Sequence, residues 1–274
     1  MSSPLAINPA LVAGMLRGFL AEETAKVGFR RVVVGLSGGL DSAVACCLAA
    51  EALGPAQVLA VLLPYRTTDP ASVRDALAVV ERTGVRHRVV EITAQVDAYL
   101  GTVPEATALR RGNKMARERM SVLYDLSLAE AALVLGTSNK TELLLGYGTL
   151  HGDMAHALNP LGDLYKTQVY ELARTLGVPE PILAKAPSAD LFEGQSDEAD
   201  LGFTYADADR ILFHLVDERR RPQEVVGMGF SAELFATVAE RMRLHQYKRR
   251  LPLIAKLSRR TIDQDFRYPR DWGY

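Results

Sequence analysis

The sequence is poor in cysteine. Its 274 residues contain only Cys46 and Cys47, which are adjacent. Neighbouring cysteines do not easily form a relaxed disulfide, and no CxxC or His/Cys spacing typical of a metal site accompanies them. Both lie in the apolar run Ala43–Ala50, which predicts a buried helix. We therefore expect small core residues and a reducing compartment.

Long apolar segments and an excess of charge are also lacking. No stretch reaches the ~18 apolar residues of a membrane span, and Met1–Ala10 has no basic region followed by an apolar run. We therefore expect a cytoplasmic protein with no membrane partner. A formal net charge of -1, with 24% charged and 48% hydrophobic residues, is ordinary for a soluble globular protein and predicts no nucleic-acid partner.

Positive charge is nevertheless concentrated near the C-terminus. From Arg241 to Tyr274 there are ten Lys or Arg and three Asp or Glu, a formal net charge of +7. Such a run is usually a solvated surface, which is the default interpretation. The alternative is a site for phosphates, on a small molecule or on nucleic acid.

Apolar patterning predicts strands that alternate with helices. The predicted strands are Arg31–Leu36, Gln57–Leu63, Arg86–Ile92 and Ala132–Gly136. The predicted helices are Leu11–Val27, Asp41–Leu53, Pro70–Thr83, Asn113–Leu128, Lys140–Leu145 and Lys166–Leu176. This alternation favours an α/β fold with a parallel, doubly wound sheet and helices on both faces. Such sheets bind ligands at the carboxyl ends of their strands.

The pattern changes after residue 146. Residues 187–202 are rich in Pro, Gly, Ser and acids and predict a loop, whereas Tyr205–His245 is predicted to be helical. No convincing linker interrupts the chain. We therefore expect one domain over 1–274, with an α/β core at about 30–205 and a helical extension with a basic tail at 206–274.

A glycine-rich segment joins the first predicted strand to the next helix. It reads Gly35, Leu36, Ser37, Gly38, Gly39, Leu40, Asp41, Ser42. Glycines allow a tight turn and a close approach to a ligand, and the helix N-terminus that follows favours an anion. The segment is not a Walker A loop, because GxxxxGK[ST] requires a lysine that is absent. For an isolated SGG, a simple turn with Asp41 and Ser42 as favourable first-turn residues would be preferred.

The complete string SGGxDS resembles the pyrophosphate loop (PP-loop) of the ATP-pyrophosphatase superfamily. Members of this superfamily cleave ATP between the α and β phosphates. The resemblance implies a Rossmann-like sheet of the adenine nucleotide alpha hydrolase type and ATP as a substrate. It leaves the individual member of the superfamily open.

Segments further along the chain resemble NAD synthetases. They are Gly112–Arg117 (GNKMAR), Gly136–Glu142 (GTSNKTE), Asn159–Thr167 (NPLGDLYKT), Pro187–Leu191 (PSADL) and Lys248–Pro252 (KRRLP). Five ordered segments at compatible spacing identify the chain as a member of this family. The family resemblance implies amidation of deamido-NAD by an ATP-consuming ligase that forms a carbon–nitrogen bond, and it implies a homodimer.

The resemblance also implies roles for individual residues. The loop Gly35–Ser42, Thr137, Lys166 and Ser188 would contact ATP, and Asp41 and Glu142 would hold Mg²⁺. Arg117 would contact deamido-NAD, and Tyr247 and Lys248 stand where the family has a His-Lys pair in the substrate site. Asp153 matches an aspartate that helps to deprotonate the incoming ammonium, so Asp153 and Lys166 are the catalytic candidates.

Each assignment has a structural alternative. Asn139 and Glu142 resemble a capping box, Asp41 could serve only the helix dipole, and Lys166 could be an exposed lysine at a helix start. Thr137 and Ser188 could be turn or cap residues. Asp153 could be a turn residue, and Arg117 could belong to a solvated helix face.

The family's chemistry activates a carboxylate, which is otherwise a poor acyl donor. The carboxylate attacks the α-phosphate of ATP, pyrophosphate leaves, and ammonia attacks the acyl-adenylate to give the amide and AMP. Glutamine-dependent relatives carry a glutaminase domain with a catalytic cysteine. Here about thirty residues precede the first predicted strand, and both cysteines lie in an apolar helix. We therefore expect free ammonia as the nitrogen source, unless a separate glutaminase supplies it.

The sequence departs from the commonest ammonia-dependent pattern at two substrate positions. Leu150 and Ala157 stand where that pattern has a Lys and an Asp. Losing the cation should weaken that contact by ~1.5–3 kcal/mol, unless Lys248, His151 or His156 compensates.

Three other functions compete with this interpretation, of which the first is the main alternative. The first is a related PP-loop amide ligase for a different carboxylate. The second is a nucleic-acid enzyme such as a tRNA thiolase, which would need a reactive loop cysteine or a zinc site. The third is a non-catalytic nucleotide-binding module. The features needed for the second are not visible in the sequence, and the presence of Asp41, Glu142 and Lys166 disfavours the third.

Overall fold

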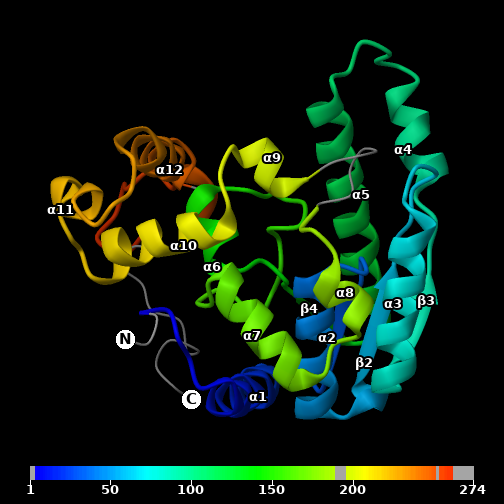
Figure 1. The fold of residues 1–274 in the computed structure, drawn as a ribbon. Coiled ribbons are helices and arrows are strands. Elements are labelled where there is room, and N and C mark those ends of the chain that lie inside the picture. The colour runs from blue at the N-terminus through cyan, green and yellow to red at the C-terminus, as the bar shows by residue number, and fades with distance from the viewer. Residues whose placement is uncertain (1–3, 189–195, 251–252, 262–274) are drawn as a thin grey trace.

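A parallel sheet of four strands lies at the centre of the molecule (Figure 1). The computed structural model describes residues 4–188, 196–250 and 253–261. The strands are β1 Arg31–Gly35, β2 Val58–Leu62, β3 Arg86–Val89 and β4 Ala132–Leu135, in the order β3-β2-β1-β4. All three pairings are parallel. Successive strands are added outward from β1 to β3, and β4 is then added on the other side of β1. This change in the order of the strands confirms the predicted doubly wound topology.

Helices cover both faces of this sheet. Val32 and Val34 of β1 point to one face, where they pack in a cluster with α1 (Pro9–Lys26), α2 (Leu40–Leu53), α3 (Pro70–Thr83) and α7 (Lys166–Leu176). Val33 points to the other face, towards α4 (Thr93–Leu100) and α5 (Ala108–Ala129). Alternate side chains of one strand therefore enter two separate cores, which explains why the strand is apolar throughout.

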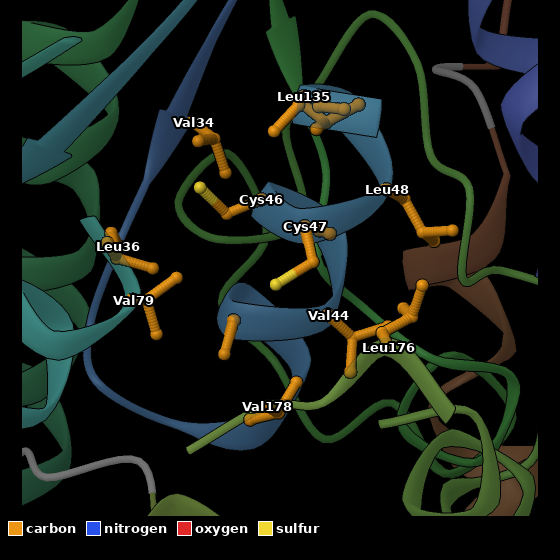
Figure 2. Packing of buried hydrophobic residues seen from close by; sticks show 14 of the residues in the cluster. Val34, Leu36, Val44, Cys46, Cys47, Leu48, Val79, Leu135, Leu176 and Val178 are labelled. Carbon is orange, nitrogen blue, oxygen red and sulfur yellow. The ribbon is translucent and has the colours of Figure 1, made fainter. Parts of the chain in front are cut away.

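The two cysteines lie in the first of these cores. Figure 2 shows Cys46 and Cys47 of α2 among apolar side chains that include Val34 and Leu135. They are 0% and 3% exposed, and neither forms a disulfide. Burial raises the pKa of the Cys46 thiol to about 12 and that of Cys47 to about 11. The expectation of small core residues is confirmed, and a buried thiol with a raised pKa is poorly reactive.

The irregular segment after α6 (Lys140–Leu145) returns to the edge of the sheet. Leu158 forms an isolated parallel bridge with Leu135, and the Gly136 N–H donates to the Leu158 carbonyl at 2.6 Å. Ala157 in turn donates its N–H to the carbonyl of Val134 at 2.9 Å. This attachment brings the segment that contains Asp153 beside the end of β4.

The C-terminal part folds into a third core. It comprises α10 (Tyr205–Leu212), a π-helical segment η2 (Phe213–Asp217), α11 (Pro222–Val226), α12 (Ala232–Leu244) and η3 (Gln246–Arg249). Ile211 and Leu212 are fully buried there against Leu145 of α6 and Tyr165. The predicted helical region is therefore a series of short helices, and Pro222 begins one of them at a position that tolerates proline.

Some element boundaries were predicted incorrectly. Helix α5 begins at Ala108 and not at Asn113, because the Thr107 hydroxyl accepts from the Arg110 N–H and caps it. The helices α4 and α8 (Glu180–Ala184) and the short 3-10 turn η1 (Pro55–Gln57) were not predicted. The predicted loop at 187–202 contains helix α9 (Asp197–Leu201), which has acids in its first turn and Gly202 in the left-handed region after it. Residues 189–195 of that loop, with Ala189–Leu191 of the PSADL motif, and Leu251–Pro252 lie outside the described residues.

None of the helices in the described ranges has the length and apolar character that a membrane span needs.

Candidate active site

The loops that follow β1 and β4 meet at the carboxyl edge of the sheet. These strands are neighbours, and the order in which strands are added to the sheet changes direction between them. A cavity of about 990 Å³ opens at this point. Predicted site residues that line it are Gly35, Leu36, Ser37, Gly39, Leu40, Asp41, Ser42, Arg117, Thr137, Glu142, Asp153, Lys166, Ser188, Tyr247 and Lys248. The sheet topology explains this convergence, because parallel strands of a doubly wound sheet end at one edge.

Hydrogen bonds of Ser37 and Ser42 hold the glycine-rich loop in its conformation. The Ser42 hydroxyl donates to the Gly39 carbonyl at 3.0 Å and lies 3.1 Å from the Ser37 hydroxyl. The N–H of Gly39 donates to the Ser37 hydroxyl at 3.2 Å. Helix α2 begins at Leu40, and its cap Gly39 has no side chain that could occupy the first-turn N–H groups. That helix end therefore faces the cavity, and helix N-termini of this kind favour anions.

Gly38 does not line the cavity and packs against α3. Its φ is +81°, and an added Cβ would lie 2.1 Å from the carbonyl oxygen of Ser72. Ser72 is itself 2% exposed, so it belongs to the packed interior. The loop therefore requires glycine here on two grounds, a left-handed backbone and the absence of space.

Lys166 joins the two acids that were predicted to hold the metal. Its ammonium donates to Asp41 Oδ2 at 2.5 Å and to Glu142 Oε1 at 3.3 Å. The second oxygen of Asp41 accepts from the side-chain amide of Asn139 at 2.9 Å. Lys166 also lies over the ring of Tyr205, 5.2 Å from its centroid. These groups come from α2, α6, α7 and α10, so the fold assembles them from distant parts of the chain.

The alternatives for these residues can now be decided in part. Lys166 is only 3% exposed, so the interpretation as an exposed lysine at a helix start is wrong. Glu142 does form the capping box, because its carboxylate accepts from the Asn139 N–H while the Asn139 side chain accepts from the Glu142 N–H. Only one of its oxygens serves the cap, and the other accepts from Lys166. The capping role of Glu142 therefore leaves one of its oxygens in contact with Lys166 at the cavity.

Burial and mutual charge shift the pKa values of Glu142 and Lys166, which lie together with Asp41. Burial raises the pKa of Glu142 to about 8, and the nearby charge of Asp41 adds to this effect. Burial alone would lower the pKa of Lys166, but the charges of Asp41 and Glu142 outweigh it and raise that pKa well above its ordinary value. A protonated lysine thus faces Asp41 and a Glu142 carboxyl group that burial shifts towards its neutral form. A further cation would favour the ionised form of Glu142.

The substrate-side residues lie along the same cavity. The Arg117 side chain donates through Nε to the Leu150 carbonyl at 3.1 Å. Tyr247 is 57% exposed, and Lys248 donates to the carbonyls of Gly146 and Gly148, each at 2.8 Å. Burial lowers the pKa of Lys248. Lys248 therefore orders the backbone of the segment that leads to Leu150 as well as facing the cavity.

Asp153 faces the cavity from that segment. It accepts from the Thr149 N–H at 2.8 Å through Oδ1. The side chain of Asp153 is exposed. The protein around it raises its pKa, although hydrogen bonds from Thr149 and the nearby charge of Lys248 oppose this. Asp153 therefore holds the turn at Thr149 and also lines the cavity.

A model of the NAD synthase family matches residues 12–252. The chain belongs to the NAD synthase family. The NH3-dependent NAD+ synthetase of Trichlorobacter lovleyi is 58% identical over 271 residues, which cover 99% of each chain. The matched region therefore includes both the α/β core and the C-terminal helices. The Rossmann-like PP-loop fold expected from the sequence is confirmed.

Solved structures of relatives agree with this. The NMN synthetase of Francisella tularensis has a TM-score of 0.81 and 33% identity, covering 91% of this chain and 99% of its own. The NH3-dependent NAD synthetase of Campylobacter jejuni has a TM-score of 0.78 and 33% identity, covering 91% of this chain and all of its own. Both likenesses extend over nearly the whole molecule.

Several residues that line this cavity were not identified from the sequence. Asp197, Asp200, Tyr147, Arg241 and Lys185 also line the cavity. The Tyr147 hydroxyl donates to Asp197 at 3.0 Å, and the Tyr205 hydroxyl donates to the other oxygen of Asp197 at 3.1 Å. Asp197 lies in the region predicted to be a loop. No local pattern marks it, because its partners come from α6, α10 and the turn that follows α6.

Proposed function

We propose that this chain is an ammonia-dependent NAD synthetase. It uses ATP to convert the nicotinic-acid carboxylate of deamido-NAD to the amide, with AMP and pyrophosphate as products. One observation carries this proposal. The anion-binding end of α2 and the buried Lys166, held between Asp41 and Glu142, line one cavity in a chain of the NAD synthase family.

The arrangement suits attack on the α-phosphate of ATP. The loop Gly35–Ser42 would hold the β and γ phosphates by its N–H and hydroxyl groups, which leaves the α-phosphorus facing the open cavity. A carboxylate oxygen then forms a bond to that phosphorus while the bond to the pyrophosphate oxygen breaks. Lys166 spreads the negative charge on the phosphates as pyrophosphate leaves. Thr137 and Ser188 would contact ATP from the cavity wall.

The second step replaces AMP by nitrogen. Ammonia attacks the carbonyl carbon of the acyl-adenylate, the carbon–oxygen bond to AMP breaks, and the added nitrogen gives up a proton. Asp153 is the group proposed to take a proton from the incoming ammonium, because it faces the cavity with an acceptor oxygen. The protein does little covalent work, and positioning and charge stabilisation account for the rate.

The residues present fit a magnesium ion that is shared with ATP. Mg²⁺ is usually held by one or two carboxylates together with substrate phosphates and water. Asp41 and Glu142 supply two such side chains. Burial is the main cause of the raised pKa of Glu142, and a bound cation would favour its ionised form. Among the described residues no group of three or more His, Cys, Asp or Glu could hold a metal by itself. When bound, the ion would neutralise phosphate charge beside Lys166.

Deamido-NAD would lie on the opposite side of the cavity. Arg117, Tyr247 and Lys248 line that wall and are the proposed contacts, since a guanidinium and an ammonium suit its pyrophosphate and carboxylate. Leu150 lines the same wall in the place of the commoner lysine. We further propose a cytoplasmic homodimer with deamido-NAD near its interface. Leu109, Tyr124 and Leu128 of α5 support the dimer, being 70%, 43% and 84% exposed.

A panel of carboxylic acids tests the substrate. We expect ATP, Mg²⁺ and ammonium to give AMP and pyrophosphate with deamido-NAD, and one NAD for each AMP. Nicotinic acid mononucleotide belongs in the panel, because a relative of this fold is an NMN synthetase. Other acids should give little AMP. The products are measured by chromatography, with a reaction lacking ammonium as the control.

The same panel separates the competing functions. Faster AMP formation with another acid would assign the chain to a different PP-loop amide ligase. No AMP with any acid would favour a non-catalytic nucleotide-binding module. An ammonia supply from a separate glutaminase changes none of these outcomes, because ammonium is present in excess.

A further inference from the structure

A buried aspartate outside the α/β core contacts the residues next to Lys166 and Glu142. Asp209 lies on α10 and is 0% exposed. One of its oxygens accepts from the Thr141 hydroxyl at 2.5 Å. The other accepts from both the N–H and the hydroxyl of Thr167, each at 2.8 Å. A carboxylate can accept from all three donors at once, which no neutral side chain of this size can do.

The partners of Asp209 are the immediate neighbours of the two site residues. Thr141 precedes Glu142 in the first turn of α6, and Thr167 follows Lys166 in the first turn of α7. The Thr141 hydroxyl also accepts from the backbone N–H of Lys166 at 3.0 Å. One connected network therefore fixes the starts of both helices relative to each other.

The same network places a negative group at the N-terminus of α7. The N–H of Thr167 is one of the first N–H groups of that helix, and it has no acceptor in the preceding turn of the helix. A carboxylate there is favoured by the helix dipole as well as by the hydrogen bonds. Tyr205, on the same α10, supplies the ring under the Lys166 ammonium. Helix α10 lies beside α6 and α7 (Figure 1).

We propose that Asp209 is a positioning residue for ATP binding, acting through Lys166. It does not line the cavity, so it acts only by holding α7 against α6 at the spacing that lets one ammonium reach both Asp41 and Glu142. The helical extension thereby completes a site whose phosphate loop belongs to the α/β core. This inference rests on the proposed function only in taking Lys166 to bind ATP phosphates.

A coupling measurement distinguishes positioning from general support of the fold. ATP dissociation constants would be measured by calorimetry, in Mg²⁺ and without any acid substrate, for the wild type, Asp209→Asn, Lys166→Met and the double variant. Asp209→Asn should weaken ATP binding about tenfold in the wild-type background, the scale for residues that orient a binding group. In the Lys166→Met background the same change should cost less than about twofold, because the group that it orients is gone.

Three further variants keep the test decisive if Asp209→Asn does not fold. Thr167→Val removes one hydroxyl donor at constant volume and should weaken ATP binding about threefold, whereas Thr167→Ser keeps the hydroxyl and should bind as the wild type does. Asp207→Asn changes another acid of α10 that accepts from Thr204 and should not alter ATP binding. Circular dichroism checks that each protein is folded.

Equal losses in the wild-type and Lys166→Met backgrounds would overturn the proposal, as would wild-type binding by Asp209→Asn or Thr167→Val. The proposed function fails separately, if the wild type binds ATP but forms no amide from deamido-NAD. An absence of ATP binding in the wild type would overturn both.

Discussion

Replacing Asp41 by Asn should slow AMP formation by about 10³-fold or more, a scale typical of losing one charge-stabilising group at a phosphoryl-transfer site. Asp41 lies in the first turn of α2, and its side chain accepts from the Lys166 ammonium at 2.5 Å. Asparagine keeps the shape of the side chain but gives neither a charge for Mg²⁺ nor a strong acceptor for Lys166. The rate is measured as AMP released from ATP with deamido-NAD and ammonium.

A control variant in another helix distinguishes a role of Asp41 in the reaction from an interaction with the helix dipole. Glu233 is the first-turn acid of α12, so Glu233→Gln removes the same kind of dipole interaction from a helix away from the cavity. We expect Glu233→Gln to lower the free energy of unfolding by at most ~1 kcal/mol and to leave turnover unaltered. Comparable activity in Asp41→Asn and the wild type, with both folded, would show that Asp41 serves the helix and not the reaction.

Gly38→Ala should weaken ATP binding by about 100-fold or more. The new Cβ would lie 2.1 Å from the Ser72 carbonyl oxygen, and a φ of +81° is unfavourable for alanine. The loop must therefore move away from α3, and its N–H groups then no longer converge on a phosphate. ATP affinity is measured by calorimetry and stability by thermal unfolding.

Gly28→Ala is the matched control for the backbone effect. Gly28 has a φ of +79°, but nothing lies within 4 Å of an added Cβ. We expect it to cost about 1–2 kcal/mol of stability with no change in ATP affinity. If Gly38→Ala behaved in the same way as Gly28→Ala, the loop would not need its packing against Ser72 in order to bind nucleotide.

The sequence was informative where chemistry and regular structure depend on neighbouring residues. The phosphate loop lies within eight residues, between a β-branched strand and an apolar helix, so composition and spacing define it. The capping box of Asn139 and Glu142 is equally local. The ends of parallel strands meet at one edge, which is why Asp41 and Glu142 could be expected together before the structure was known.

The sequence was less informative where distant segments decide the environment. Lys166 has the pattern of an exposed helix-start lysine, and only the packing of α10 and α2 around it makes it 3% exposed. Asp209 carries no local signal, since Thr141 and Thr167 are 68 and 42 residues away in sequence. The helix α9 was missed because its short acidic sequence resembles a polar loop, and its start is fixed by contacts with the rest of the fold.

An isotope experiment tests the central claim most directly. Deamido-NAD labelled with ¹⁸O in both carboxylate oxygens is converted with ATP and ammonium, and the AMP is examined by mass spectrometry. Attack of the carboxylate on the α-phosphorus predicts one ¹⁸O in the AMP and one in the amide for each turnover. Unlabelled AMP, or ADP and phosphate as products, would contradict the account, because the carboxylate would then not have displaced pyrophosphate from ATP.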